Sequence, residues 1–544
     1  MKKRIFLILL LTFALMFGIL TNASASGILV FGSGGDAAKL DPGDATDGES
    51  IQRMDNIFEG LVSYKADNTE IEPCLATSWE ASTDGTEITF HLREGVKFHD
   101  GTDFNADAVL FSFARQYDTN HPYHQYGEWS YWGYMYSDVE KMEKIDDYTA
   151  KLVLKRPNAS IMTSLAMFPV NIVSPTNAEK YTEDAFKNPC GTGPFKFVEW
   201  VKDDHITLEA NENYWRERAS LDKLIFKVIP DPSARLMNLE TGEVQGIEYP
   251  NPADFDRIRA NKDLNLMTQA GMNIGYMAMN TGYGYIDANE NGVRDIASEP
   301  LVKTPGYFEP LTKKGVRQAI NLAIDKQAIV DNLYMGTAIK ATNGMPPFML
   351  GYNDAIADYP YDPEKAKKLL AEAGYPDGFE VTLYVMPVSR PYMFDPPKVG
   401  EAIQSYLAAV GITVKFYQVD WATYLQETEE GNHQMCMLGW SGDNGDPDNF
   451  MNVLYGANAC SIGSAGNYAF YTNNTVQELL SAALATYDDT KRAIYYKKAQ
   501  EMIHEDAGWV YLAHSTQNIV FRTNVKGFVL NPTSRKFFYP VTVE

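Results

Sequence analysis

Basic residues are few in this chain relative to acidic ones. Its 544 residues include 47 lysines and arginines against 71 aspartates and glutamates, which gives a formal net charge of −24. Such a chain repels phosphate backbones and gains nothing from counterion release, so nucleic acid is not expected as a partner. No internal repeat or low-complexity tract occurs. With 45% hydrophobic and 22% charged residues the composition is globular, and the length suffices for about three or four domain-sized cores.

Long apolar runs are almost missing. The one long run covers residues 5–20; residues 2–4 before it are basic, and residues 23–25 after it are Ala-Ser-Ala. This order is typical of a secretory signal peptide, with cleavage expected after about Ala25. The run is short for a membrane span, and no comparable run follows. We therefore expect residues 1–25 to be a signal peptide and the mature protein to be soluble and periplasmic.

Cysteine is also scarce, with four in the chain. None directly follows the apolar run, so a lipid anchor is not expected. In an exported protein four cysteines are compatible with disulfides, and three connectivities are open. We favour Cys74 with Cys190 and Cys436 with Cys460, because each pair would lie within one of the lobes proposed below. The alternative is buried free thiols that act as small apolar residues.

Motifs of the common catalytic classes are missing. Ser220 and Lys223 form an S-x-x-K match, but the S-D-N and K-T-G partners of the penicillin-recognising enzymes are absent. His504 and Glu505 lack the second histidine of H-E-x-x-H. No G-x-S-x-G, P-loop lysine or complete dinucleotide fingerprint occurs. An enzyme is therefore the weaker class, and no catalytic residue is predicted.

Hydrophobic periodicity indicates a mixed first half and a regular second half. Alternation over residues 85–93 predicts a strand, and Asn105 followed by apolar residues at helical spacing predicts a capped helix. From Thr312 onward, helices and strands alternate as in an open sheet with helices on its faces, which indicates an α/β fold. Expected strands cover 379–385, 412–419 and 434–438, expected helices cover 362–374, 399–410, 476–485 and 490–503, and two short strands are expected near Val510 and Ile519.

Two long motifs carry a resemblance to a known family. Residues 439–450 read Gly-Trp-Ser-Gly-Asp-Asn-Gly-Asp-Pro-Asp-Asn-Phe, and residues 386–392 read Met-Pro-Val-Ser-Arg-Pro-Tyr. Both resemble the corresponding segments of bacterial periplasmic dipeptide-binding proteins, in the peptide and nickel solute-binding family of ABC importers. Shorter matches extend the resemblance over nearly the whole mature chain; they lie at 90–101, 191–195, 249–254 and 361–366.

The resemblance implies the fold. It is a two-lobed periplasmic-binding-protein fold of type II with an extra subdomain in the first lobe. The expected parts are the main subdomain of lobe 1 at 26–60, 195–275 and 512–544, the extra subdomain at 61–194, and lobe 2 at 276–511. We expect the hinge near residues 274–279 and 511–515, where the chain crosses between the lobes.

The resemblance also implies the site residues. In the family, the aspartate of a Trp-x-x-Asp motif binds the ligand's α-ammonium and the arginine of Arg-Pro-Tyr binds its α-carboxylate, which carries over to Asp443 and Arg390. Backbone groups of the Gly-Trp-x-Gly segment pair with the peptide like an added strand. That role carries over to Gly439, Trp440 and Gly442, with Tyr392 beside them and Gly48 as the contact from the first lobe.

Elementary electrostatics supports the two charged residues independently. A zwitterionic peptide enclosed between lobes loses water around two charges, and each must meet an opposite charge. Arg390 offers a planar fork that matches a carboxylate, and Asp443 offers an anion. The alternatives are a surface salt bridge for Arg390, a solvated turn for Asp443, and core packing for Trp440 and Tyr392.

The expected function is binding without chemistry. We expect a monomeric exported receptor that captures dipeptides between closing lobes and delivers them to the membrane permease of an ABC importer, with no required cofactor. Rival ligands are longer peptides, haem or a nickel chelate. The rival from another class is a secreted peptide hydrolase.

A stretch that the resemblance does not explain predicts a structural calcium site. Residues 287–295 match the start of a calcium-binding loop, with Gly292 at the sixth place for the sharp turn. The oxygen side chains at its first, third, fifth and ninth places are Asp287, Asn289, Asn291 and Asp295. The twelfth place is Ser298 rather than glutamate, and a polar surface turn is the alternative. Bound calcium would raise the thermal midpoint in millimolar calcium over that in chelator, whereas equal midpoints would remove the hypothesis.

Overall fold

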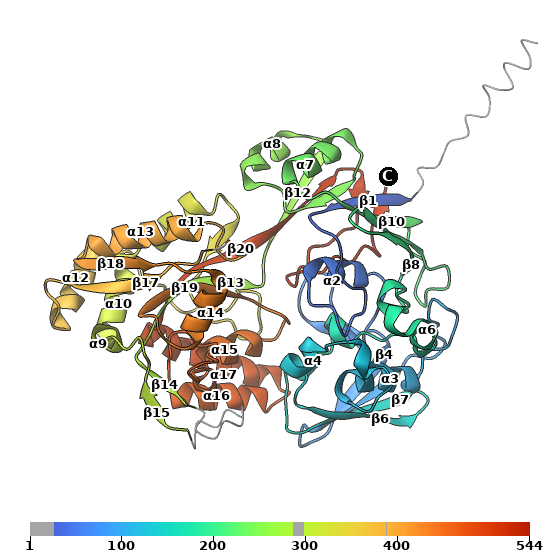
Figure 1. Ribbon diagram of the computed structural model, residues 1–544, viewed down its shortest axis with the longest axis horizontal. Coiled ribbons are helices and arrows are strands. Elements are labelled where there is room, and N and C mark those ends of the chain that lie inside the picture. Colours follow the sequence, from blue (N-terminus) through green and yellow to red (C-terminus); the bar gives the residue numbers. More distant parts are fainter. Residues whose placement is uncertain (1–26, 287–298, 388) are drawn as a thin grey trace, which may run out of the picture.

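The computed structural model describes residues 27–286, 299–387 and 389–544, which form two lobes joined by one sheet (Figure 1). The sheet has twelve strands; its main path is β18-β17-β19-β13-β20-β11-β1-β10-β9-β8, and β12 and β16 pair with β20. Lobe 2 contributes β13 (Asn273–Met279), β16 (Ala338–Lys340), β17 (Phe379–Tyr384), β18 (Ile412–Tyr417) and β19 (Met435–Ser441). Lobe 1 contributes β1 (Ile28–Ser33), β8 (Phe195–Val201), β9 (His205–Ala210), β10 (Lys223–Val228), β11 (Gly246–Glu248) and β12 (Leu264–Ala270).

A single long strand, β20 (Trp509–Arg522), links the two lobes. Its first half pairs with β13 and β16, and its second half pairs with β11 and β12. The prediction of two short strands near Val510 and Ile519 is therefore wrong. Between these apolar positions residues 514–518 are polar, because the strand there leaves one core before it enters the next. Hydrophobic periodicity alone therefore predicts that one strand ends and another begins at this crossing.

The chain crosses between the lobes at residues 271–273 and 515–516. Gly271 N donates to Ser515 O at 2.8 Å. The Asn273 side chain accepts from Ser515 N at 2.8 Å and donates to Ser515 O at 3.2 Å. The predicted first crossover, 274–279, lies instead inside lobe 2, where every residue of β13 is buried between β19 and β20.

Next to this crossover, His514 gives the fold a pH dependence. The side chain is 1% exposed; its Nδ1 donates to Asn273 O at 2.6 Å, and no described residue bonds to its Nε2. Burial lowers the pKa of His514 from 6.5 to about 4, so the unfolded chain binds a proton that the native state does not, and stability falls as pH falls below 6.5. Between pH 6.5 and pH 5 this histidine should cost about 2 kcal/mol of unfolding free energy.

Urea unfolding of His514→Gln at pH 7 and pH 5 measures this effect. The variant should lose less stability than wild type between the two pH values, and the exposed His91→Gln should behave like wild type. An unchanged pH dependence in His514→Gln would contradict the assignment.

The extra subdomain of lobe 1 has its own sheet and its own core. Its sheet has the strand order β4-β5-β7-β6, and α3 packs over β6 and β7. The residues of its hydrophobic core lie between Leu61 and Cys190 in the sequence. The strands are β2 (Val62–Tyr64), β3 (Ile71–Pro73), β4 (Ala76–Ala81), β5 (Glu87–Leu92), β6 (Val139–Asp146) and β7 (Thr149–Leu154), and the helices are α3 (Ala106–Tyr117), α4 (Ser130–Met135) and α5 (Ile161–Ser164). The extra subdomain also contains α6 (Pro175–Tyr181), which contacts α3. The main subdomain adds α2 (Gly48–Met54), α7 (Pro232–Thr241) and α8 (Phe255–Ala260).

Lobe 2 builds the largest core, from β13, β17, β19 and the helices around them. Its helices are α9 (Glu309–Thr312), α10 (Lys314–Ala323), α11 (Lys326–Leu333), α12 (Pro363–Glu372), α13 (Pro396–Ala408), α14 (Trp421–Glu429), α15 (Asp448–Tyr455), α16 (Asn474–Leu484) and α17 (Asp489–Asp506). The predicted helix after Asp362 is confirmed: Asp362 accepts from Lys365 N, Pro363 is the first helical residue, and Gly374 follows the helix at φ 96°.

The lobes also touch on the side of the extra subdomain. Ala159 N donates to Leu484 O at 2.8 Å, and the Tyr487 hydroxyl donates to the carbonyls of Gly85 and Asn158, both at 3.2 Å. The described conformation therefore has the lobes in contact both at the crossover strands and at this second place.

The predicted disulfides are not formed. All four cysteines lie in the described part of the chain, are buried, and carry no disulfide bond. Cys436 lies on β19 opposite Ala278, in the main core of lobe 2, whereas the Cys460 thiol contacts Tyr471 O in a separate small cluster. Burial raises the pKa of the Cys74 and Cys190 thiols, which favours the protonated and unreactive form.

Across residues 27–286, 299–387 and 389–544, no helix combines the length and apolar character that crossing a bilayer requires. The predicted signal peptide lies outside the described residues.

Candidate functional site

A cavity of about 680 Å³ lies between the lobes beside the crossover. Lobe 1 lines it with Arg235, Tyr249 and the start of α8, lobe 2 lines it with Arg390 and the end of β19, and residues 271–273 and 515–518 form its floor. Its volume falls within the range of small-molecule sites, about 300–1,000 Å³. Two arginines and no carboxylate line this cavity, although the whole chain is strongly acidic. The cavity therefore favours an anionic group.

Arg390 is the lining residue best placed to bind such a group. It lies in the loop between β17 and α13, where its backbone exchanges two 3.0 Å hydrogen bonds with Met393. Its guanidinium stacks over Trp421 of α14, 4.3 Å from the ring centroid. No described carboxylate or carbonyl bonds to the guanidinium, so the planar fork is oriented by the ring and keeps its donors for a ligand. The sequence did not reveal Trp421 as a partner.

The end of β19 offers a backbone edge beside this arginine. Residues 439–441 pair with β13 on one edge, whereas β17 pairs with β19 only at Met435 and Cys436. The backbone around Gly439 and Trp440 thus has one edge to which an extended peptide can add. Gly439 is required here, because a Cβ at this position would lie 2.3 Å from the Tyr392 ring.

Tyr392 itself is a packing residue. It is 7% exposed, its ring covers Gly439, and its carbonyl accepts from the Tyr334 hydroxyl at 3.2 Å. Burial raises the pKa of Tyr392 to about 12. This arrangement fits the core-packing alternative for Tyr392 and makes it the support that positions the loop of Arg390.

Asp443 follows β19, and the Asn449 side chain contacts it. Asn449 at the start of α15 accepts from Asp443 N at 2.9 Å and from the Trp440 indole at 3.1 Å, and it donates to the Asp443 carboxylate at 3.3 Å. Asn449 belongs to the motif at residues 439–450, but its role in positioning Asp443 and Trp440 depends on its place in the first turn of α15. Burial raises the pKa of Tyr131 to about 12 and the nearby Asp443 carboxylate adds to the shift, so Asp443 also faces α4 of lobe 1.

The other two aspartates of this loop have structural partners. Arg492 of α17 bonds to both carboxylate oxygens of Asp446 at 2.7 Å, and both residues are buried. Asp448 bonds to Asn452 one turn along α15. Burial, with Asp446 nearby, raises the pKa of Asp448 to about 7. Asp446 and Asp448 therefore hold the loop in place, and the anchor role of Asp443 stays a prediction.

Of the predicted ligand-binding residues, Arg390 and Gly442 line the cavity. Gly439, Trp440 and Asp443 are not among its lining residues, nor are Tyr392 and Gly48. Gly48 is the exposed first residue of α2, behind the cap formed by Asp47, and does not line the cavity with Arg390. Residues 287–298, which include the predicted calcium ligands, lie outside the described residues. Among the residues that are described, no cluster of three or more His, Cys, Asp or Glu side chains could hold a metal ion. The calcium site stays a prediction.

Comparison with known proteins gives the family of the chain. Residues 70–460 match the model of the bacterial extracellular solute-binding proteins, family 5. A dipeptide-binding protein of Escherichia coli is 39% identical over 503 residues, which cover 90% of this chain and 89% of that protein. Heme-binding protein A of Haemophilus influenzae is also 39% identical, over 90% of this chain and 87% of that protein.

A solved structure agrees with both. An ABC transporter-associated periplasmic binding protein from Helicobacter pylori, in complex with the peptide STSA, is 36% identical; the match covers 95% of this chain and 98% of that chain, with a TM-score of 0.73. The predicted fold class, a periplasmic-binding-protein fold of type II, is thereby confirmed. Together with the inter-lobe cavity, these matches show that the chain belongs to the family 5 bacterial extracellular solute-binding proteins.

Proposed function

We propose that this protein is an exported, monomeric receptor that captures dipeptides between its lobes and delivers them to the permease of an ABC importer in the periplasm. The names of the E. coli relative and of the H. pylori neighbour support peptide transport. Binding is proposed without chemistry on the ligand. Ligand contacts with both lobes stabilise the closed form, so closure is a population shift.

The observation that carries the proposal is the guanidinium of Arg390 at the inter-lobe cavity. Within the described residues it has an aromatic support and no anionic partner. A half-buried cation of this kind is matched by a ligand carboxylate. In the proposed pose, Asp443 receives the α-ammonium and the edge of β19 pairs with the peptide backbone between the two charges.

Length selectivity is an expected consequence of two ionic anchors on one lobe. Each added residue moves the carboxylate of an extended peptide by about 3.3–3.6 Å, more than a charge-assisted hydrogen bond tolerates. Calorimetric titration should therefore give tighter binding for Ala-Ala than for Ala-Ala-Ala. Equal affinities would contradict the length argument and favour a receptor for longer peptides.

The rival functions predict different products or ligands. After incubation with a dipeptide mixture, mass spectrometry should recover intact dipeptides, whereas free amino acids would indicate a hydrolase. The Haemophilus relative carries the name of a haem-binding protein. When haem is added to this protein, the absorption spectrum of the haem should stay that of free haem. A shifted haem spectrum that Ala-Ala reverses would make haem a ligand of this cavity.

A further inference from the structure

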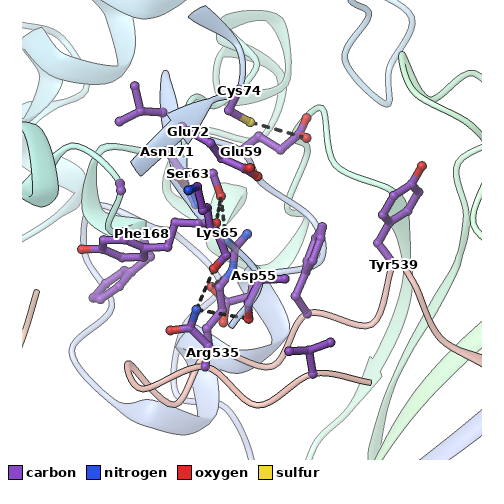
Figure 2. A pocket seen from close by; sticks show the side chains of 18 of the residues that line it. Asp55, Glu59, Ser63, Lys65, Glu72, Cys74, Phe168, Asn171, Arg535 and Tyr539 are labelled. Carbon is purple, nitrogen blue, oxygen red and sulfur yellow. Dashed lines mark hydrogen bonds and ion pairs between the residues drawn. The ribbon is translucent and has the colours of Figure 1, made fainter. Parts of the chain in front are cut away.

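A second, smaller cavity lies within lobe 1 and does not contain Arg390 or β19. It measures about 220 Å³ and lies between the end of α2, the β2–β3 hairpin and the C-terminal segment 529–540 (Figure 2). This volume equals about seven liquid water molecules and is below the range for drug-sized ligands.

Three polar side chains of its wall make no hydrogen bond or ion pair with a described residue. Within the described residues Arg216 makes no ion pair or hydrogen bond, and its guanidinium only stacks on Trp215 at 4.4 Å. The Glu72 carboxylate likewise makes no hydrogen bond or ion pair with a described residue, although its charge acts on nearby Arg216 and Lys65. Asn171 is 8% exposed, and its side-chain amide makes no hydrogen bond with a described residue. Figure 2 shows Glu72 and Asn171 at the wall of this cavity.

The remaining charged groups of the wall have side-chain partners, although Arg535 Nε makes no hydrogen bond with a described residue. The Glu59 carboxylate accepts from Thr192, Tyr214 and Trp215 at 2.7–2.8 Å. Arg535 donates to the Ser63 hydroxyl at 2.8 Å and faces Asp55 at 3.6 Å. Arg216 and Glu72 are half-buried and Asn171 is buried, so an occupant of the cavity can reach all three side chains. The unmatched set is one guanidinium, one carboxylate and one amide, all lining the same cavity.

We infer that this cavity binds a small zwitterionic amino acid. Arg216 bonds to its α-carboxylate, Glu72 to its α-ammonium, and Asn171 to a polar atom between or beside them. The volume admits a small amino acid such as glycine, alanine or serine. Since none of these residues lines the inter-lobe cavity, the site is independent of the proposed dipeptide site.

Calorimetric titration with L-serine tests the inference. Wild type and Arg390→Ala should bind L-serine equally, because Arg390 belongs to the other cavity. Arg216→Ala and Glu72→Gln should each weaken binding by about 30-fold or more, as expected when one partner of an enclosed charge pair is removed. The matched controls are Arg218→Ala and Glu212→Gln, two exposed residues that pair with each other outside the cavity. They should bind like wild type.

Two half-ligands separate a zwitterion site from a simple ion site. Acetate and ethanolamine should each bind at least about tenfold more weakly than L-serine, because each meets only one of the two charges. Circular dichroism shows whether each variant is folded. If Arg216→Ala does not fold, Glu72→Gln is the variant that tests the site. Acetate binding as tight as L-serine would overturn the zwitterion assignment. No saturable L-serine binding, or equal binding by the folded Arg216→Ala or Glu72→Gln variant, would overturn the site.

Discussion

Arg390→Ala should weaken dipeptide binding by about 2–5 kcal/mol, which corresponds to about 30-fold to several thousand-fold in dissociation constant. The reason is that the variant removes the one cation that lines the lobe 2 side of the inter-lobe cavity and leaves the ligand carboxylate enclosed without a partner. Calorimetric titration of Ala-Ala against both proteins measures the loss. The unfolding free energy should change little, since the guanidinium has no ion pair in the described protein.

A ligand without a carboxylate tests whether the lost affinity comes from the contact between Arg390 and the ligand carboxylate. Ala-Ala-amide lacks the carboxylate, so it should bind wild type far more weakly than Ala-Ala but should bind Arg390→Ala about as well as Ala-Ala does. Lys398→Ala is the control, because Lys398 is an exposed cation of the neighbouring α13 that pairs with Asp395. Undiminished discrimination between Ala-Ala and its amide in Arg390→Ala would show that another group binds the carboxylate.

Arg492→Ala should destabilise the fold by about 3–5 kcal/mol, because it leaves the Asp446 carboxylate buried without a partner. The side chains of Arg492 and Asp446 are 5% and 1% exposed, and both carboxylate oxygens bond to one guanidinium nitrogen at 2.7 Å. Urea unfolding gives the free energy. Dipeptide affinity should fall as well, since Asp446 fixes the loop that carries Asp443.

The neighbouring residue provides the control for this ion pair. Lys491→Ala removes an exposed charge whose partner, Asp488, is 3.5 Å away, and should change the unfolding free energy by about 1 kcal/mol at most. If Arg492→Ala lost no more than Lys491→Ala, the buried pair would not be the element that holds the loop.

Local sequence signals predicted much of the fold. Asn105 and Asp362 both cap helices in the structure, as their side chains and the apolar spacing after them indicate. β20 was missed because its polar middle crosses between the lobes and bonds to Asn273 there. Such a crossing is fixed by tertiary packing, which has no period in the sequence.

At the candidate site, too, the sequence predicted some residues, whereas others depended on tertiary packing. The chemistry of Arg390 and Asp443 could be predicted from residue type and from the resemblance of their motifs. Their supports could not: Trp421 stacks on Arg390 from another helix, and Asn449 holds Asp443 through the first turn of α15. The roles of Asp446 and Asp448 also depended on partners that only the fold brings close.

Native mass spectrometry in a competition tests the central claim most directly. The protein is mixed with equal amounts of Ala-Ala, Ala-Ala-Ala and acetyl-Ala-Ala, each present above the protein concentration. If Arg390 and Asp443 bind the two ends of one dipeptide, the main complex should carry a single intact Ala-Ala, with little tripeptide and less of the acetylated ligand. Preferential binding of acetyl-Ala-Ala or of the tripeptide would contradict that account.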